Sequence, residues 1–109
     1  TTAALLFHIL KFNKIKSVIC GNFGVPACSI NDPGEKGVII LELSSYQLDG
    51  AKNLSLDMAT IINITPDHLD YHENFVRYIT SKLKIIFLLL IWQLKHLLRY
   101  EFLLDGYYH

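Results

Sequence analysis

The sequence predicts an α/β fold in which helices flank a mostly parallel sheet. Three short runs of β-favouring apolar residues, at 17–20, 37–43 and 58–64, are each followed by turn-forming or polar residues. Residues 2–14 and 75–86 instead carry apolar side chains at helical spacing. Because strands alternate with helical or loop segments, we expect a layered structure built on a parallel sheet.

The first two elements are a helix and a short strand. Residues 2–14 are apolar at mostly helical spacing and become polar toward Lys14, which predicts an amphipathic helix. The following strand, residues 17–20, stops at the glycine-containing segment 21–24.

The second strand, residues 37–43, follows a turn at Asn31–Gly34. It is almost continuous in Val, Ile and Leu, a pattern typical of a sheet covered on both faces. The third run, residues 58–64, ends at Thr65 and Pro66, and a polar stretch leads into the last predicted helix.

Length and composition limit the function. The 109 residues suffice for one modest domain, and the ten basic and ten acidic side chains cancel without a basic cluster, so we expect no nucleic-acid binding. The cysteines, Cys20 and Cys28, form no zinc-type spacing and indicate packed, reduced thiols in a cytoplasmic protein. The most apolar stretch, residues 85–92, is too short to predict a membrane span.

Polar residues that follow the apolar strands are the candidate functional residues, because ligands of open α/β sheets bind beyond the carboxyl ends of the strands. Gly21 and Asn22 follow the first strand, and Glu42 and Ser44 end the second. An acid at the end of an apolar strand is costly unless it binds a cation or several donors. Glu42 is therefore either a metal or ligand contact or a strand-end acid that faces water.

The segment Asp67–His72 gathers two carboxylates and two imidazoles within six residues, a mixture suited to Mg²⁺ coordination, phosphate contact or proton transfer. The alternative is a solvated turn in which Asp67 or Asp70 caps the following helix. Lys82, in the second half of the predicted helix, is by default a cation that offsets the helix dipole. His8, alone in an apolar helix, is by default packed or capped.

Four segments together resemble the central domain of the Mur ligases, in the order found in that family. They are residues 20–27 (Cys-Gly-Asn-Phe-Gly-Val-Pro-Ala), residues 41–49 (Leu-Glu-Leu-Ser-Ser-Tyr-Gln-Leu-Asp), residues 63–70 (Asn-Ile-Thr-Pro-Asp-His-Leu-Asp) and the helix around Lys82. The first two segments are most similar to the D-glutamate-adding members. Residues 67–72 also resemble the members that add diaminopimelate or lysine, which remain the alternative.

The resemblance implies a P-loop NTPase-like fold and a peptidoglycan-synthesis reaction. ATP would phosphorylate the carboxylate of UDP-N-acetylmuramoyl-L-alanine, and D-glutamate would attack the acyl phosphate to form an amide. Glu42 and His68 resemble Mg²⁺ ligands, and Lys82 matches a lysine that is carbamylated to hold a second Mg²⁺. His68 and Lys82 would thus be catalytic, while Asn22, Ser44 and Gln47 resemble contacts to the muramoyl substrate.

Two departures from the family pattern shape the expected domain organisation. The GxxGK[ST] loop that holds ATP phosphates does not occur in the chain, and Thr1 and Thr2 align just after it, at a Mg²⁺- and nucleotide-binding position. Residues 88–109 resemble nothing in the family. We therefore expect a truncated central domain at 1–87, inactive alone, and a divergent apolar tail at 88–109 whose simplest origin is a shifted reading frame. The alternative function is a non-catalytic gene-decay product that associates or aggregates.

Overall fold

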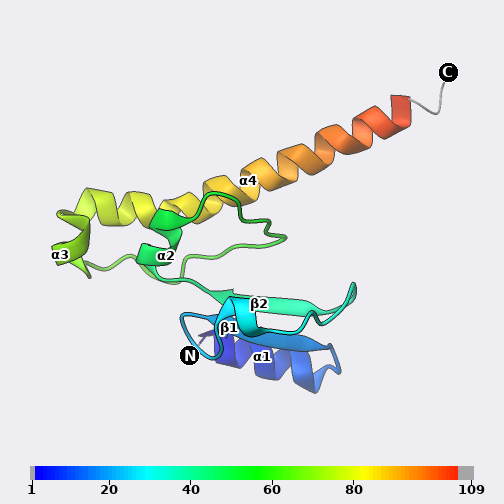
Figure 1. Cartoon of the computed structure of the whole chain (residues 1–109), viewed down its shortest axis with the longest axis horizontal. Helices are drawn as coiled ribbons and strands as arrows, with labels where there is room; N and C mark the ends of the chain where they lie inside the picture. The colour runs from blue at the N-terminus through cyan, green and yellow to red at the C-terminus, as the bar shows by residue number, and fades with distance from the viewer. Residues whose placement is uncertain (1, 106–109) are drawn as a thin grey trace. The chain divides into compact units, whose positions relative to one another are not determined.

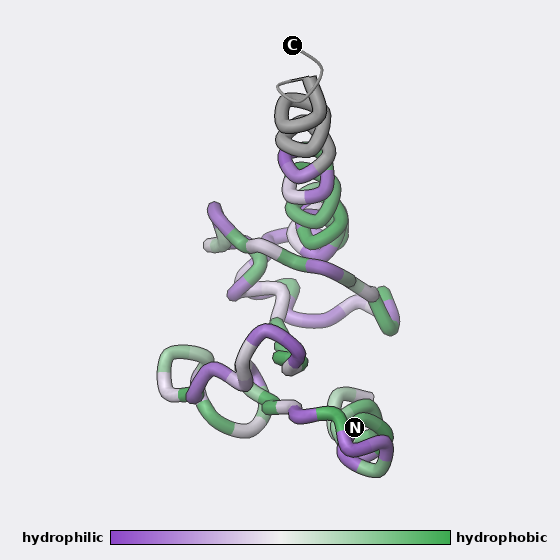
Figure 2. The backbone as a smooth tube through the Cα atoms, turned by 90° about the vertical axis from the view of Figure 1, so that its right-hand side faces the viewer, coloured by the Kyte–Doolittle hydropathy of each residue, from purple (hydrophilic) through white to green (hydrophobic). Residues whose placement is uncertain are grey.

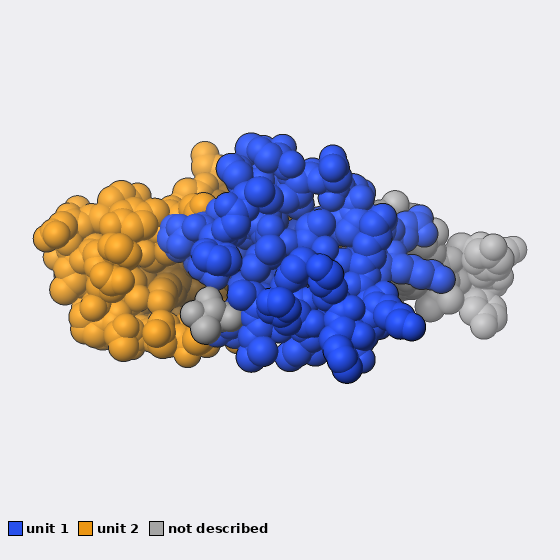
Figure 3. All heavy atoms as spheres, turned by 90° about the horizontal axis from the view of Figure 1, so that it is seen from below, with its two compact units in different colours: residues 1–44 blue, residues 45–109 orange. Residues whose placement is uncertain are grey.

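The computed structural model describes residues 2–105, with side chains described as far as His96. It divides into two compact units, residues 1–44 and 45–109, which are coloured separately in Figure 3. Figure 1 labels the helices and strands. None of the helices in the described part of the chain has the length and hydropathy required to cross a membrane.

The first unit contains helix α1 (Thr2–Phe12) and a parallel sheet of two strands, β1 (Ser17–Gly21) and β2 (Val38–Glu42) (Figure 1). The register pairs Ser17 with Val38 and Gly21 with Glu42, so the carboxyl ends of both strands lie at one edge. The predicted fold class, a small parallel sheet with helical cover, is confirmed.

Helix α1 packs on both strands, but not through the side chains that its sequence favours. The half-buried residues are Ala3, Ala4, Phe7 and Leu10, which recur at helical spacing. Leu5, Ile9 and Phe12 are exposed instead, and so is Ile39 of β2. Residues 2–44 therefore cover the sheet less completely than the continuous apolar pattern of β2 predicts.

The loop between the strands contains the predicted turn. The Gly34 amide donates to the Asp32 carboxylate at 2.7 Å, and the Gly37 amide donates to the Gly34 carbonyl at 2.8 Å. A short 3-10 helix, η1 (Ala27–Ser29), precedes it. The turn returns the chain to the start of β2.

The second unit is helical, with α2 (Ser45–Gly50), α3 (Leu69–His72) and α4 (Phe75–Asp105). The third predicted strand is wrong: residues 58–64 form no ladder with any of residues 2–105, and Met58 and Ile62 are exposed. An isolated strand would leave its amide and carbonyl groups without partners, so this segment runs as an irregular connection between α2 and α3.

Helix α4 is much longer than the predicted helix at 75–86, because it continues without interruption to Asp105. The middle of α4 is largely hydrophobic, as the colouring of Figure 2 shows. Its buried side chains, Tyr78, Ser81 and Leu88, lie within the first half, and Tyr78 and Ser81 contact His72 of α3. Phe87, Leu90 and Leu94 are exposed.

Candidate functional site

In the first unit, Asn22 and Glu42 lie side by side at the carboxyl ends of β1 and β2. The Asn22 amide donates to the Glu42 carbonyl at 2.7 Å, and the Gly21 amide donates to the Val25 carbonyl at 3.0 Å. A bridge between Cys20 and Val25 closes the same loop. Two residues selected from different strands are thus joined by a backbone hydrogen bond.

Gly21 permits this close approach. Its φ of 105° lies in a region that side-chain-bearing residues rarely adopt, and a Cβ built on Gly21 would overlap the Glu42 carbonyl oxygen. The Gly21–Asn22 sequence is therefore required by the geometry that sets Asn22 against the end of β2.

Glu42 is half-buried, and its carboxylate makes no hydrogen bond or ion pair with the side chains described, those of residues 2–96. An oxygen ligand that is partly withdrawn from water and carries an uncompensated charge suits a hard cation such as Mg²⁺. The partial exposure of Glu42 is compatible with both predicted roles, a metal or ligand contact and a strand-end acid that faces water.

In the second unit, His68 is the N-cap residue of α3 and has a left-handed conformation, with φ of 53°. The Asp67 carboxylate accepts the His68 amide at 2.8 Å and lies 3.4 Å from His68 Nε2. The ring of His68 also contacts Tyr46 of α2, at 4.8 Å between centroids. Asp67 thus orients His68, whose imidazole remains partly exposed and available to a ligand.

The predicted alternative, a solvated turn in which Asp67 or Asp70 caps the following helix, is right about the turn, because residues 67–71 are exposed, but wrong about the cap. Asn74 supplies the cap of α4, because its side-chain oxygen accepts the Arg77 amide at 3.0 Å. No side-chain cap is made at the start of α3. An Asn immediately before an apolar helical run is the sequence signal that identifies this cap.

Lys82 is half-buried on α4 and reaches back to the connection between α2 and α3. Its Nζ donates to the Asn63 carbonyl at 3.0 Å and lies 4.9 Å from the centroid of the Tyr78 ring. The default role at the end of a helix does not apply, because α4 continues for more than twenty residues beyond Lys82. The amine is instead held at a defined place beside an irregular segment.

The remaining predicted site residues occupy more ordinary positions. Ser44, which follows β2, is half-buried, and Gln47 is exposed on α2. Thr2 is the exposed first residue of α1, whereas Thr1 lies outside the described residues. Residues 2–105 contain no group of three or more His, Cys, Asp or Glu side chains arranged to hold a metal ion.

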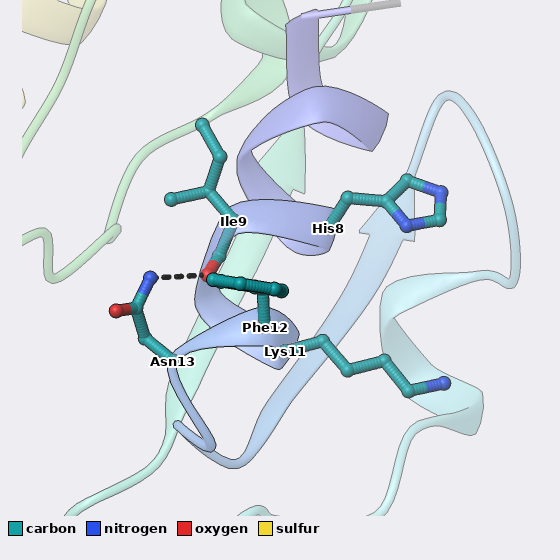
Figure 4. A pocket seen from close by; sticks show the side chains of 5 residues that line it. All are labelled: His8, Ile9, Lys11, Phe12 and Asn13. Atoms are coloured by element: carbon teal, nitrogen blue, oxygen red, sulfur yellow. Dashed lines mark hydrogen bonds between the residues drawn. The ribbon is translucent and has the colours of Figure 1, made fainter.

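His8 is neither packed in a core nor a cap. It is exposed on α1, meets the edge of Phe7 and lines a shallow hollow with Ile9, Lys11, Phe12 and Asn13. In Figure 4 the His8 ring points away from Phe12, and the one bond drawn joins the Asn13 side chain to the Ile9 carbonyl. The hollow gathers no convergent set of polar groups.

The two cysteines differ from each other. Cys20 is fully buried in β1, as expected of a packing residue, and burial raises the pKa of its thiol. Cys28 is exposed, so its predicted packing role is wrong. Both are free thiols.

A buried hydrogen-bonded group in the second unit was missed by sequence reasoning. His72 is 3% exposed and contacts Ser45 and Ser81, which are buried as well. His72 belongs to the polar stretch already singled out, but nothing in the spacing indicated that it, rather than His68, would be the buried imidazole. Its partners come from two other helices: Ser45 of α2 is 27 residues away and Ser81 of α4 is nine residues away.

Two of the motifs follow the strands of the parallel sheet and two lie in the helical unit. The chain belongs to the Mur ligase middle domain family, whose sequence model matches residues 1–91. It is similar to a UDP-N-acetylmuramoylalanine–D-glutamate ligase of Rickettsia bellii, 49% identical over 85 residues, which is 78% of this chain and 18% of the relative. Enzymes with the same name from Zymomonas mobilis and Thermotoga petrophila are 43% and 42% identical over 88 residues, in each case 81% of this chain and 20% of the relative. The chain thus spans about a fifth of the length of these relatives.

Proposed function

We propose that this chain provides the middle-domain part of an ATP-dependent ligase that joins D-glutamate to UDP-N-acetylmuramoyl-L-alanine in peptidoglycan synthesis, in the cytoplasm. The observation that carries the proposal is the hydrogen bond that sets Asn22 against Glu42 at the carboxyl edge of the sheet. That edge is where α/β enzymes bind ligands, and the names of the relatives supply the reaction. Members of the family that add diaminopimelate or lysine are the alternative.

The reaction concentrates negative charge on the transferring phosphoryl group and on the tetrahedral intermediate, which Mg²⁺ would neutralise when bound. Glu42 would contribute a carboxylate ligand, and its half-buried, uncompensated charge supports this role. His68, held by Asp67, would contribute an imidazole nitrogen. Asn22, Ser44 and Gln47 would contact the muramoyl substrate, and Thr1 and Thr2 would lie near the ATP phosphates.

Lys82 would act after carbamylation. In that reaction the neutral amine forms a bond to the carbon of CO₂, loses a proton, and becomes a carbamate with oxygen donors suited to Mg²⁺. The Lys82 amine donates to the Asn63 carbonyl and lies over the Tyr78 ring. Carbamylation therefore requires the Lys82 side chain to leave both partners.

The 109 residues do not include a GxxGK[ST] sequence, whose backbone amides and lysine would hold the β- and γ-phosphates. We therefore expect the isolated chain to be inactive and to bind no ATP. In a calorimetric titration of ATP and Mg²⁺ into the purified chain, no saturable heat should appear. Saturable binding at micromolar ATP would contradict this part of the proposal.

The ligase function itself is tested in a chimera. The matching 85-residue segment of the Rickettsia bellii enzyme is replaced by the corresponding residues of this chain. Release of ADP that depends on both UDP-N-acetylmuramoyl-L-alanine and D-glutamate is the expected result. A folded chimera without this activity, while the unmodified relative is active, would refute the proposal.

A second candidate function is self-association, and the exposed apolar side chains of α4 favour it. Phe87 is 65% exposed, and Leu90, Ile91 and Leu94 are each about half exposed. These residues recur every three or four positions, the spacing of a helix face that packs on another helix. Sedimentation equilibrium should then show association that Phe87→Lys with Leu94→Lys abolishes, whereas a monomer at all concentrations would exclude this function.

A further inference from the structure

The second unit contains a chain of hydrogen bonds centred on His72. Ser45 Oγ lies 2.9 Å from His72 Nε2, and Ser81 Oγ lies 3.5 Å from His72 Nδ1. Ser81 in turn donates to the Asp49 carboxylate at 3.2 Å. Ser45, His72 and Ser81 are each at most 5% exposed, so the imidazole and both hydroxyls are withdrawn from water.

The direction of these bonds follows from the number of hydrogens available. An ionised carboxylate only accepts, so the single hydroxyl hydrogen of Ser81 goes to Asp49. Ser81 Oγ can then only accept from His72, which places the imidazole hydrogen on Nδ1. In a neutral imidazole, His72 Nε2 is then left as an acceptor for the Ser45 hydroxyl.

Ser45, His72 and Ser81 each lie on a helix that carries, or directly follows, a proposed site residue. Ser45 is on α2, two residues before Gln47, and His72 ends α3, whose N-cap residue is His68. Ser81 precedes Lys82 on α4. Two more hydrogen bonds join these helices at Asp49. The Tyr71 hydroxyl donates to the Asp49 carboxylate at 3.3 Å, and Lys84 Nζ donates to the Asp49 carbonyl at 2.6 Å.

We propose that His72 is a positioning residue of the ligase, which fixes the elements bearing Gln47, His68 and Lys82 relative to one another without touching substrate. The proposal rests on the proposed function, since it assigns the purpose of the arrangement. Ser45 is too buried to be a nucleophile, so the Ser–His–Ser–Asp series serves position and not bond cleavage. Removal of one of the hydrogen bonds of His72 should loosen the irregular segment 51–68 and so weaken the hydrogen bond between Lys82 and the Asn63 carbonyl.

The test uses NMR on the 109-residue chain labelled at histidine and lysine. In the unsubstituted chain, His72 should show a protonated Nδ1 and an unprotonated Nε2. Ser81→Ala removes one hydroxyl with little change in volume. It should abolish that tautomer preference and speed exchange of the Lys82 ammonium hydrogens about fivefold, the factor expected for one ordinary hydrogen bond.

Matched variants separate positioning from general stability. Ser81→Thr restores the hydroxyl and should restore both signals. Thr80→Ala removes a hydroxyl that donates to the Val76 carbonyl of its own helix, and it should change neither signal. His72→Phe should have the effect of Ser81→Ala, and if it does not fold, Ser81→Ala still decides. A protonated Nε2 in the unsubstituted chain, or Lys82 exchange unchanged by Ser81→Ala, would overturn the proposal. Neither result depends on ligase activity, so the two failures are distinguishable: a negative NMR result overturns the positioning role of His72, whereas an inactive chimera refutes the proposed function and, with it, the purpose assigned to that role.

Discussion

Replacement of Gly21 by alanine should disturb the candidate site directly, because two costs meet at this position. The φ of 105° is strained for alanine by about 1–3 kcal/mol. The added Cβ would also overlap the Glu42 carbonyl, which accepts the Asn22 amide. Displacing that carbonyl adds an overpacking cost of about 1–3 kcal/mol, which includes the weakened hydrogen bond.

Gly34 provides the matched control. Its φ is 88°, but a Cβ there would meet nothing within 4 Å, so Gly34→Ala carries the backbone cost alone. We expect Gly21→Ala to be about 1–3 kcal/mol more destabilising than Gly34→Ala in urea unfolding. Hydrogen exchange of the Asn22 amide should be accelerated in Gly21→Ala relative to Gly34→Ala. Equal destabilisation, with the Asn22 amide equally protected in both variants, would refute the account of how Gly21 places Asn22 against Glu42.

Three further predictions concern other parts of the molecule. In the native chain a thiol reagent should modify the exposed Cys28 before the buried Cys20, and equal reactivity of both thiols would contradict this prediction. Burial raises the pKa of Cys20 in the folded state alone, so the free energy of unfolding should fall as the pH rises above the ordinary thiol pKa of 9.0. Cys20→Ala should remove this pH dependence. Gly50→Ala should stabilise the chain by about 0.4–1 kcal/mol in urea unfolding, because Gly50 has no positive φ and a Cβ there meets nothing within 4 Å. A loss of stability in this variant would contradict the description of α2. Asn74→Ala should lower the free energy of unfolding by about 1 kcal/mol through loss of the α4 cap, with Asn53→Ala as an exposed control without effect.

The sequence predicted the local part of the fold well. Helix α1 and both paired strands lie within a few residues of their predicted positions, because periodicity and turn residues act over short distances. The parallel pairing followed from the order of elements. The rule that ligands bind beyond the carboxyl ends of parallel strands also selected Asn22 and Glu42, which are joined by a backbone hydrogen bond in the structure.

The sequence-based predictions fail where contacts between separate segments of the chain determine the structure. Residues 58–64 have the composition of a strand, but strand structure depends on a ladder partner, which their sequence cannot specify. The predicted apolar face of α1 is mostly exposed, because α1 packs on the sheet through Ala3, Ala4 and Phe7. His72 escaped notice for the same reason, since its partners Ser45 and Ser81 are 27 and 9 residues away.

The central claim is that Glu42 serves as a metal ligand in a ligase, and the chimera tests it most directly when ADP release is measured against Mg²⁺ concentration. Glu42→Gln should lower kcat about 100-fold or more and raise the Mg²⁺ concentration required for half-maximal rate, because the amide carries no charge. The control Glu35→Gln, an exposed acid before β2, should leave both quantities unchanged. Equal Mg²⁺ dependence and equal rates in the two variants would contradict the claim.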